Sequence, residues 1–512
     1  MKAGSAIVKR LLLAAGTLSL VAGCATTGPI PRPLSGLGKI ASVDRRFQSY
    51  NVEMVEVTGG RFWAPYGGPP GEVYRMRPPV DLDNPRLRAL ARHLGPAYMR
   101  VSGTWANSTY LPAEGETVTA PPEGYNQVLT RKQWRDVVDF AKAVDAEIVT
   151  SFAVSPGTRD ADGLWKPEQA QRLLDLTREA GGTIAAAEFY NEPNASMVGG
   201  LPKGYSAADY VRDFRIFDAW VRQAAPEITI LGPGGVGEGA LGDVPVNALK
   251  GAILSKDMLA PNPGRLDAFS YHFYGSVSQR CASVGRKTAQ KDEALTSQWL
   301  DLTLRDHAFY AGLRDTYEPG DPLWITETAQ AACGGSPWAA SFLDTFRYVN
   351  QMGLLAQKGV AVVMHNTLAA SDYSLIAEDT LRPRPNYWAA VLWRRTMGTT
   401  VLRPPASPTP ELRLYAHCLE GRLGGVALAA INLGDQAQTM QLQGVATSWV
   451  LQAQPLDSET ITVNGQEPGV DAAGGLTGLA GKRQIGSMRI PGKAIAFVAV
   501  PGANNAACLA GS

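Results

Sequence analysis

Residues 184–194 read Ile-Ala-Ala-Ala-Glu-Phe-Tyr-Asn-Glu-Pro-Asn, an apolar run that ends in an amide, a carboxylate and a proline. A short apolar run closed by a turn signal is typical of a buried strand in a parallel sheet. In a (β/α)₈ barrel, the side chains that carry out chemistry lie at the carboxyl ends of the strands. The stretch therefore predicts a barrel strand with Asn191 and Glu192 at its end.

A second carboxylate closes a similar stretch farther along the chain. Residues 322–328 read Pro-Leu-Trp-Ile-Thr-Glu-Thr and follow a Gly-Asp turn, so Glu327 also ends a predicted buried strand. The interval between Glu192 and Glu327 has room for about three βα units, which places the two residues on strands 4 and 7. Two opposed carboxylates are what glycosidic bond cleavage needs, because one protonates the leaving oxygen while the other attacks the anomeric carbon.

Two points stay open from these residues alone. Asn-Glu-Pro also occurs by chance, and most glutamates are solvated surface charges. The distance between the two carboxyl groups decides the stereochemistry, because about 5 to 5.5 Å gives retention and about 6.5 to 9.5 Å gives inversion. The outcome therefore depends on how the barrel closes.

Residues 266–275, between the two glutamates, read Leu-Asp-Ala-Phe-Ser-Tyr-His-Phe-Tyr-Gly and predict strand 6. His272 and Tyr274 alternate along this strand and therefore share one face. A hydrogen bond from the Tyr274 hydroxyl would stabilise the ionised form of Glu327. The alternative is an aromatic core strand without a role at the site.

Two other predicted strands carry supporting residues. Residues 98–104 predict strand 2, where Arg100 would support Glu327 from inside the barrel and would itself need a carboxylate partner. Residues 360–366 predict strand 8, which ends in His365 and Asn366 beside the sugar pocket. For each of these residues, structural support explains the position equally well.

The barrel is predicted to open with a strand at residues 50–57. Glu53 or Glu56 at the top of this strand would then lie close enough to contact a glycan. A purely structural role is again an equal alternative.

The pattern of predicted strands and helices changes near residue 400. Before it, short apolar strands alternate with helical patterns, the order expected for a βαβ barrel, and after it glycine-rich alternating segments predict an antiparallel β-sandwich. The predicted helices are 134–144, 167–180 and 208–224, and the predicted sandwich strands are 412–418, 425–432, 448–451 and 495–500. We expect a (β/α)₈ barrel at 46–398, a β-sandwich at 399–512, and a linker at 24–45 that includes a possible strand of the sandwich.

The first residues predict a bacterial lipoprotein signal. Three basic residues precede an apolar run at 11–22, which is too short for a transmembrane helix and ends in Val-Ala-Gly-Cys. Cleavage would remove residues 1–23 and leave Cys24 as the site of lipid attachment. We expect an exported protein anchored to a bacterial membrane, with the outer membrane favoured because no inner-membrane retention signal follows Cys24. The alternative is an ordinary secretory signal.

The overall charge excludes one class of partner. The chain has 48 basic and 47 acidic residues, so loss of the three basic residues of the signal leaves 45 basic residues. A nearly neutral molecule argues against a nucleic-acid binder. Attraction of a polyanionic glycan would need a local cluster, for which Arg280, Arg286 and Lys287 are candidates unless they belong to a solvated loop.

Several motifs of the chain occur in a fixed order. They are Asn191–Asn194, Trp324–Thr328, Gly334-Gly335, Asp372-Tyr373, Asn386–Trp388, Arg413–Cys418 and Ala506–Cys508. This order resembles that of the heparanase and β-glucuronidase family, glycoside hydrolase family 79, over nearly the whole mature chain. Asn-Glu-Pro is shared across the wider clan, whereas the strand with Tyr-Ala-His-Cys and the terminal Ala-Ala-Cys are features of the family itself.

The resemblance implies a role for each residue of the pair and its neighbour. Glu192 would be the general acid/base, Glu327 the nucleophile, and Asn191 a ligand of the sugar 2-hydroxyl. Two departures leave the outer subsites open. Cys333 stands where heparanases have an aromatic residue, and Tyr271-His272 stands where they have paired histidines.

The resemblance also implies a uronic-acid site. The backbone amides of Gly334 and Gly335, with the phenol of Tyr373, would hold the sugar carboxylate, because glycine lets backbone donors approach an anion closely. Taken alone, the glycine pair would be an ordinary turn. The other expected substrate contacts are His272, Tyr274 and Asn366.

Four cysteines follow Cys24, and four allow three disulfide pairings in a compartment that permits them. The resemblance implies a Cys418–Cys508 bridge, and we expect Cys281 to pair with Cys333 because both follow consecutive catalytic strands. No Cys-x-x-Cys or histidine-rich cluster with zinc spacing appears, so neither a metal nor another cofactor is implied.

We therefore predict a retaining hydrolase of β-glucuronidic linkages that acts on a glucuronide or a glucuronic-acid-containing glycan. One alternative is a related clan enzyme for arabinosides or xylosides, and another is a surface lipoprotein that binds glycan without cleaving it. Loss of activity toward glucuronides in Tyr373→Phe would favour the uronic-acid prediction, whereas glycan binding without turnover would favour the binder. Exo and endo action are both compatible with these residues.

Overall fold

The computed structural model describes residues 33–509 except 67, 70, 240–250 and 285–287. The predicted signal peptide, Cys24, Arg286 and Lys287 therefore lie outside the described residues. Within the described part of the chain, none of the helices combines the length and apolar character of a transmembrane span.

Eight parallel strands close into a barrel, as the sequence predicted. In chain order they are β2 (Gln48–Glu53), β5 (Ala97–Ser102), β8 (Ala146–Ser151), β9 (Ile184–Glu188), β10 (Thr229–Val236), β11 (Ala268–Tyr274), β12 (Leu323–Ala329) and β13 (Val362–His365). The segments predicted as strands 4, 6 and 7 are β9, β11 and β12. They place Glu192, His272 and Glu327 at the same mouth of the barrel.

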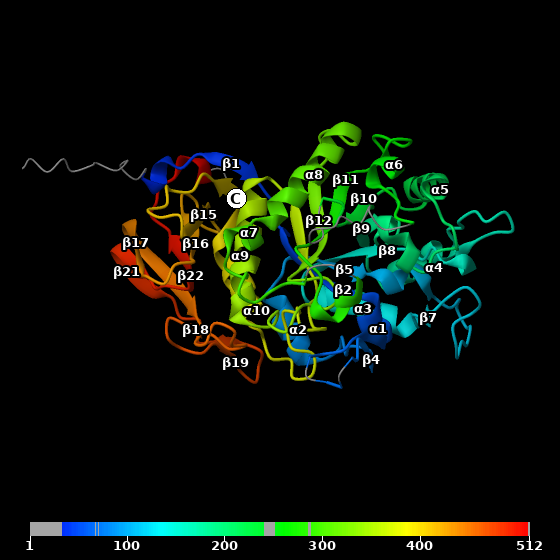
Figure 1. The fold of residues 1–512 in the computed structure, drawn as a ribbon, viewed down its shortest axis with the longest axis horizontal. Coiled ribbons are helices and arrows are strands. Elements are labelled where there is room, and N and C mark those ends of the chain that lie inside the picture. Colours follow the sequence, from blue (N-terminus) through cyan, green and yellow to red (C-terminus); the bar gives the residue numbers. More distant parts are fainter. Residues whose placement is uncertain (1–32, 67, 70, 240–250, 285–287, 510–512) are drawn as a thin grey trace, which may run out of the picture.

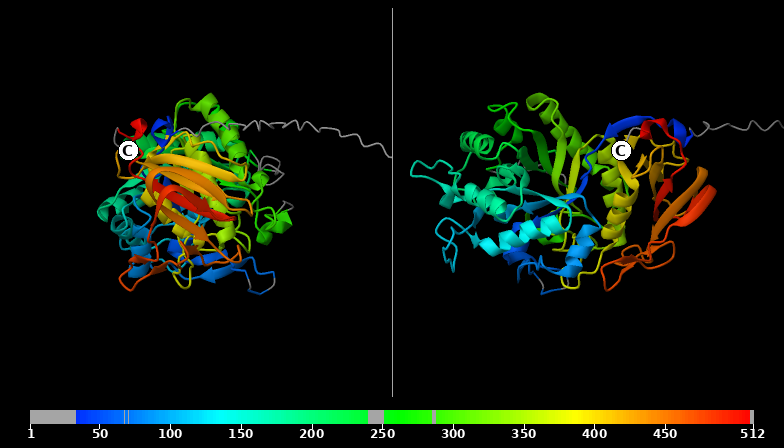
Figure 2. Two further views of the ribbon diagram at one scale, coloured as in Figure 1. Left: turned by 90° about the vertical axis from the view of Figure 1, so that its left-hand side faces the viewer. Right: turned by 180° about the vertical axis from the view of Figure 1, so that it is seen from behind.

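Helices surround the barrel (Figure 2). The longer ones are α2 (Pro85–Arg92), α3 (Arg131–Ala143), α4 (Glu168–Glu179), α5 (Ala207–Ala224), α8 (Leu302–Tyr317), α9 (Phe342–Gln357) and α10 (Pro385–Thr396), and the short ones are α1 (Met54–Thr58), α6 (Ser255–Leu259) and α7 (Ser297–Leu300). Helix α3 begins where Thr130 and Gln133 form a reciprocal capping box, and Ser206 and Asp209 do the same for α5. With these caps, α3 starts three residues before the predicted position 134, and α5 starts one residue before the predicted position 208.

The first strand is shorter than predicted. The sequence indicated a strand at residues 50–57, but β2 ends at Glu53 and α1 follows at once. The Glu56 carboxylate accepts a hydrogen bond from the Glu53 N–H at 2.6 Å and so caps this turn of helix. The apolar alternation across Tyr50, Val52 and Met54 continues into α1, which is why the pattern alone placed the end too late.

The C-terminal strands form one antiparallel sheet of eight strands. Its members are β1 (Lys39–Ser42), β14 (Met397–Leu402), β15 (Leu412–Leu419), β16 (Val426–Asn432), β22 (Ala494–Val500), β17 (Gln438–Gln452), β18 (Thr462–Val463) and β21 (Lys482–Ile490). The register of β17 shifts between Gln441 and Val445, and Met440 and Met488 pack with Leu414, Leu428 and Val498 in one core. The sheet thus supplies both layers of this core itself.

Three two-stranded pieces complete the fold, namely β3 (Gly60–Trp63) with β4 (Tyr74–Arg77), β6 (Thr109–Tyr110) with β7 (Gln127–Val128), and β19 (Gly469–Val470) with β20 (Leu476–Thr477). Strand β1 lies in the segment that was expected to donate a strand to the sheet, and it pairs with β14. Both expected disulfide pairs, Cys281–Cys333 and Cys418–Cys508, are joined.

Helices α9 and α10 lie between the barrel and the C-terminal sheet (Figure 1). Tyr415 of β15 lies against Gly353 of α9, where an added Cβ would come within 2.3 Å of the ring. The Tyr415 hydroxyl donates to Asn350 at 2.6 Å, and Arg413 contacts both Asn350 and Asp301. These contacts attach the sheet to α9 on the outer wall of the barrel.

Candidate active site

Glu192 directly follows the turn after β9 and precedes the 3₁₀ helix η4 (Pro193–Val198). Its backbone lies in the left-handed region with φ 49°, which few residues other than glycine adopt. The side chain of Asn107 holds this turn, because it accepts from the Asn191 N–H at 2.9 Å and donates to the Asn191 carbonyl at 3.0 Å. The Glu192 side chain remains 19% exposed, so it can meet a substrate.

Glu327 is buried on β12 and receives hydrogen bonds on both carboxylate oxygens. The Tyr274 hydroxyl donates to Oε1 at 2.6 Å, and Arg100 Nη1 donates to Oε2 at 3.1 Å. The Asn366 amide lies 3.4 Å from Oε1. Donors on both oxygens stabilise the ionised form, as a nucleophile requires.

Arg100 also has the carboxylate partner that its burial demands. Its Nη2 and Nε donate to Glu188 Oε2 at 2.8 and 3.1 Å. Burial raises the pKa of Glu188, but the Arg100 charge and the donated hydrogen bonds lower it to below its ordinary value. Burial likewise lowers the pKa of Arg100, and Glu188 and Glu327 raise it above its ordinary value. One guanidinium thus pairs with two carboxylates inside the barrel.

Arg100 orients Asn191 as well. Its Nη2 donates to Asn191 Oδ1 at 2.7 Å, so the amide oxygen is occupied and the Asn191 NH₂ group faces away from the guanidinium. The NH₂ group lies 3.5 Å from the Thr104 hydroxyl, and its predicted role as a ligand of the sugar 2-hydroxyl stays a prediction.

The two glutamates lie close together across the mouth of the barrel. One carboxylate oxygen of Glu192, one of Glu327 and a ring nitrogen of His272 all lie within 4.8 Å of one another. This spacing is near the value of about 5 to 5.5 Å for retention and well below about 6.5 to 9.5 Å for inversion.

The same three groups could also ligate a divalent cation. The Arg100 guanidinium, 3.1 Å from Glu327, already supplies the positive charge that this carboxylate needs. We therefore assign no metal to the site.

His272 joins the two glutamates. Its Nδ1 lies 3.1 Å from Glu192 Oε1 and 3.6 Å from Glu327 Oε2. Its Nε2 lies 3.3 Å from Arg100 Nη2, whose two N–H groups donate to Glu188 and Asn191 at shorter distances. Burial alone would lower the pKa of His272, but the Glu327 charge and the hydrogen bond with Glu192 raise it.

The expected carboxylate loop follows β12. Cys333, Gly334 and Gly335 all have positive φ (63°, 81° and 82°), and an added Cβ at Gly334 would come within 2.8 Å of the Trp63 side chain. The Gly335 N–H donates to the Ala331 carbonyl at 3.2 Å. The Gly334 N–H has no acceptor among the described residues. Of the two amides predicted for this role, Gly334 thus offers the free donor.

Asn366, directly after β13, lies among the side chains around Glu327. Its amide nitrogen is 3.1 Å from the Tyr373 hydroxyl, 3.0 Å from the Tyr274 hydroxyl and 3.1 Å from Glu53 Oε1. Burial, followed by the nearby Glu327 charge, raises the pKa of Glu53 well above its ordinary value. Glu53 thus holds the Asn366 amide from within the barrel.

Two other predicted contacts face away from the pocket. His365 donates from Nε2 to the Tyr373 carbonyl at 2.8 Å, and burial lowers its pKa to about 4, so it is a neutral support for the Tyr373 loop. Glu56 lies 3.8 Å from Arg77, and burial raises its pKa to about 7. Neither side chain reaches the two glutamates.

Sequence reasoning missed Glu188 and Asn107. Glu188 lies on the same face of β9 as Ala186, which packs in the barrel interior, so a carboxylate inside the apolar run was the available signal. No sequence pattern pointed to Asn107, because its side chain meets the Asn191 backbone only in the folded barrel.

Comparison with known proteins agrees with this geometry. No family model matches the chain. It is 27% identical to mouse heparanase over 390 residues, covering 66% of this chain and about two thirds (68%) of that protein. It is 23% identical to the hyaluronoglucuronidase of the leech Hirudo nipponia over 477 residues, covering 84% and 92%.

A solved structure shares the fold. The 4-O-α-L-rhamnosyl-β-D-glucuronidase of Fusarium oxysporum 12S superposes with a TM-score of 0.59 at 12% identity, covering 90% of this chain and 97% of that one. At this identity the likeness concerns the architecture alone. The shared architecture is a barrel with an appended antiparallel sheet.

Proposed function

Because the chain is a homologue of heparanases and of a hyaluronoglucuronidase, we propose that it is a retaining glycoside hydrolase that cleaves β-glucuronidic linkages. One observation carries the proposal. The carboxylates of Glu192 and Glu327 approach within 4.8 Å across the barrel mouth, a spacing that suits a covalent glycosyl-enzyme. The substrate would be a glucuronide or a glycan that contains glucuronic acid.

In the first step, Glu192 donates its proton to the glycosidic oxygen while a Glu327 oxygen attacks the anomeric carbon. The bond to the leaving group breaks, and a glycosyl ester forms on Glu327. In the second step, Glu192 takes a proton from water, and the water oxygen displaces Glu327. His272, whose Nδ1 faces Glu192, would orient the acid through both steps.

The surrounding residues support this chemistry. Asn191 would donate to the sugar 2-hydroxyl, and that hydrogen bond strengthens as the transition state develops. Arg100 and Tyr274 donate to the two carboxylate oxygens of Glu327 and so fix the orientation of the nucleophile. These groups are all preorganised before the substrate arrives, which is how hydrogen-bond donors contribute most to catalysis.

The uronate carboxylate would bind between Gly334 and Tyr373. The loop that carries the free Gly334 N–H is hydrogen-bonded to the loop that carries Tyr373. The Gly334 carbonyl accepts from the Asp372 N–H at 3.2 Å and from Ser371 Oγ at 2.9 Å. A backbone donor and a phenol suit an anion at the bottom of a dry pocket.

The proposal predicts a clear substrate preference. We expect the purified protein to release nitrophenol from p-nitrophenyl β-D-glucuronide about 100-fold or more faster than from the matching glucoside, arabinoside or xyloside, because a site built for hydrogen bonds rejects analogues that lack the group. Initial rates would measure this. Turnover of a neutral glycoside but not of the glucuronide would show that the substrate is a neutral sugar. Binding of size-defined heparan sulfate without its cleavage, and without nitrophenol release, would show a glycan-binding protein.

A second expected result concerns Tyr274. We expect Tyr274→Phe to lower kcat about 10- to 100-fold, the scale of one hydrogen bond to a charged group. The matched control is Tyr271→Phe on the same strand, where the ring stacks on Tyr310 and the hydroxyl has no partner among the described residues. Kinetics on the glucuronide should show near wild-type activity for the control, and equal losses in both variants would contradict the role of Tyr274.

We also propose that the protein is exported and held on a bacterial membrane, the outer membrane being favoured, through a lipid on Cys24. The proposal rests on the basic, then apolar, then Val-Ala-Gly-Cys order of the first 24 residues. Fractionation of cells that produce the wild type and Cys24→Ala tests it, since a variant that stays in the membrane fraction would contradict the anchor.

A further inference from the structure

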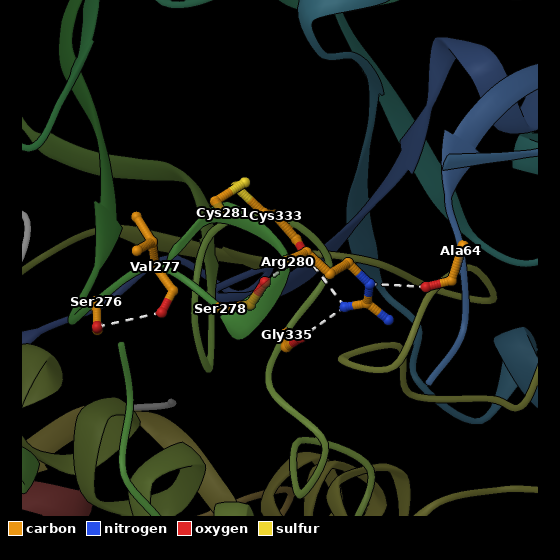
Figure 3. The surroundings of a disulfide bond; sticks show 8 residues. All are labelled: Ala64, Ser276, Val277, Ser278, Arg280, Cys281, Cys333 and Gly335. Carbon is orange, nitrogen blue, oxygen red and sulfur yellow. Dashed lines mark hydrogen bonds between the residues drawn. A yellow bond between two sulfur atoms is a disulfide. The ribbon is translucent and has the colours of Figure 1, made fainter. Parts of the chain in front are cut away.

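Arg280 lies in the 3₁₀ helix η6 (Gln279–Val284), directly before the Cys281–Cys333 disulfide (Figure 3). The sequence suggested a surface patch here, but the Arg280 side chain is only 3% exposed. Its guanidinium is bonded on every side. A residue that binds a polyanion from solvent needs an exposed guanidinium, and Arg280 does not have one.

The Arg280 guanidinium donates to the backbone carbonyls on either side of the Gly334 carbonyl. Arg280 Nη1 donates to the Gly335 carbonyl at 2.7 Å and to the Cys333 carbonyl at 3.3 Å. The Cys333 carbonyl also accepts from the Ser278 hydroxyl at 2.9 Å. Figure 3 shows Arg280, Ser278 and Gly335 beside the Cys281–Cys333 disulfide.

These bonds determine where the Gly334 N–H points. The Cys333 carbonyl and the Gly334 N–H are opposite ends of one planar trans peptide, so the two groups point in opposite directions. Holding the carbonyl on Arg280 therefore turns the N–H away from Arg280. Donors on a carbonyl also polarise its peptide, which strengthens the N–H as a donor.

The same guanidinium holds the second part of the uronate site. Arg280 Nη2 pairs with Asp372, the residue before Tyr373. From the other side, Arg384 Nη1 donates to the carbonyls of Ser371 and Asp372 at 2.7 and 2.8 Å. The loop that carries the Tyr373 phenol is thus fixed relative to the glycine loop.

A third segment is tied to the same group. Arg280 Nε donates to the Ala64 carbonyl at 2.7 Å, and the guanidinium lies 3.8 Å from the centre of the Tyr66 ring. Both residues follow β3, whose Trp63 lies against Gly334. Three loops, after β3, after β12 and after β13, therefore meet on one buried cation.

We propose that Arg280 is a positioning residue that sets the preference of the site for an anionic sugar. It acts by aiming the Gly334 N–H and by holding Tyr373, and it does not itself contact the substrate, because its own donors are used by carbonyls and Asp372. The inference rests on the proposed function, since it assumes that these two groups bind a uronate.

The test compares Arg280→Gln and Arg280→Lys with a matched control. Arg159 has similar but fewer contacts elsewhere in the barrel: it pairs with Asp213, donates to the Val154 carbonyl at 2.9 Å and lies 5.3 Å from the Tyr205 ring centre, while its Nε has no partner among the described residues. Arg159→Gln therefore loses a comparable set of buried contacts. Each protein is assayed on p-nitrophenyl β-D-glucuronide and on the β-D-glucoside.

We expect Arg280→Gln to lower kcat/KM for the glucuronide about 10- to 100-fold, the scale of one charge-assisted hydrogen bond. The change should appear mainly in KM, because the carboxylate is held in both ground and transition states. The rate on the glucoside should change little. Arg280→Lys should recover part of the loss, since it keeps the charge but not the fork of donors.

Two outcomes would overturn the inference. Equal losses on both substrates, or the same change of the substrate ratio in Arg159→Gln, would reduce Arg280 to general structural support. Hydrogen exchange of the peptides that cover 331–336 and 371–374 provides a readout that needs no substrate. If the wild type does not cleave glucuronides, the proposed function is wrong. Faster hydrogen exchange of these peptides in Arg280→Gln would still support the positioning role of Arg280, and unchanged exchange would reject it.

Discussion

Replacement of Glu327 by Gln is expected to lower kcat on the glucuronide by about 10⁴-fold or more, the scale seen when a hydrolase loses its nucleophile. The amide keeps the size of the side chain and can still contact Tyr274 and Arg100, but it cannot form the glycosyl ester. Single-turnover and steady-state rates of nitrophenol release would measure the loss.

The matched control uses another buried glutamate. Glu318 lies before β12, at the opposite end of that strand from Glu327, and accepts from the Gly264 and Leu266 N–H groups. Glu318→Gln should therefore leave kcat close to that of the wild type. A Glu327→Gln variant with wild-type kcat would exclude this residue as the nucleophile.

Azide distinguishes the roles of the two glutamates. In Glu327→Ala, azide can occupy the space of the nucleophile and attack the sugar directly, which inverts the anomeric centre. In Glu192→Ala, the glycosyl ester still forms from a good leaving group, and azide replaces the activated water, which retains the configuration. NMR of the glycosyl azides would show the two anomers, and the reverse result would exchange the assignments.

Replacement of Arg100 by Met is expected to lower the free energy of unfolding by about 3 to 5 kcal/mol, the cost of leaving a buried charge without its partner. Glu188 is buried and depends on this guanidinium. Among the described residues its other hydrogen bonds come from the Ser270 and Thr326 hydroxyls at 2.8 and 2.7 Å, and His272 Nε2 lies 4.0 Å away. Urea denaturation followed by fluorescence would measure the change from the midpoint and slope.

Two comparisons sharpen this prediction. The double variant Arg100→Met with Glu188→Gln removes the stranded charge, so it should recover a large part of the lost stability. Arg178→Met breaks an ion pair with Glu227 whose side chains are 44% and 53% exposed, and it should cost less than about 1 kcal/mol. An Arg100→Met variant as stable as Arg178→Met would refute the description of a shared buried cation.

Much of the barrel could be predicted because the signal is local. Apolar runs that end in polar residues placed β9, β11 and β12, and the alternation of His272 and Tyr274 put both on the face toward Glu327. The same local logic failed at residues 54–57. There, the Glu56 cap turns the chain into α1, and a capping hydrogen bond does not interrupt an apolar pattern.

The sequence by itself determined which residues stand at the ends of the strands and what chemistry they carry, because strand periodicity and residue type are properties of neighbouring positions. Only the tertiary structure decided which of them meet. Arg100, Glu188 and Glu327 come from the second, fourth and seventh strands, and they share one charge because the barrel closes around them. The spacing of Glu192 and Glu327, the free Gly334 N–H and the bonds of Arg280 likewise depend on packing between distant segments, on which no local pattern bears.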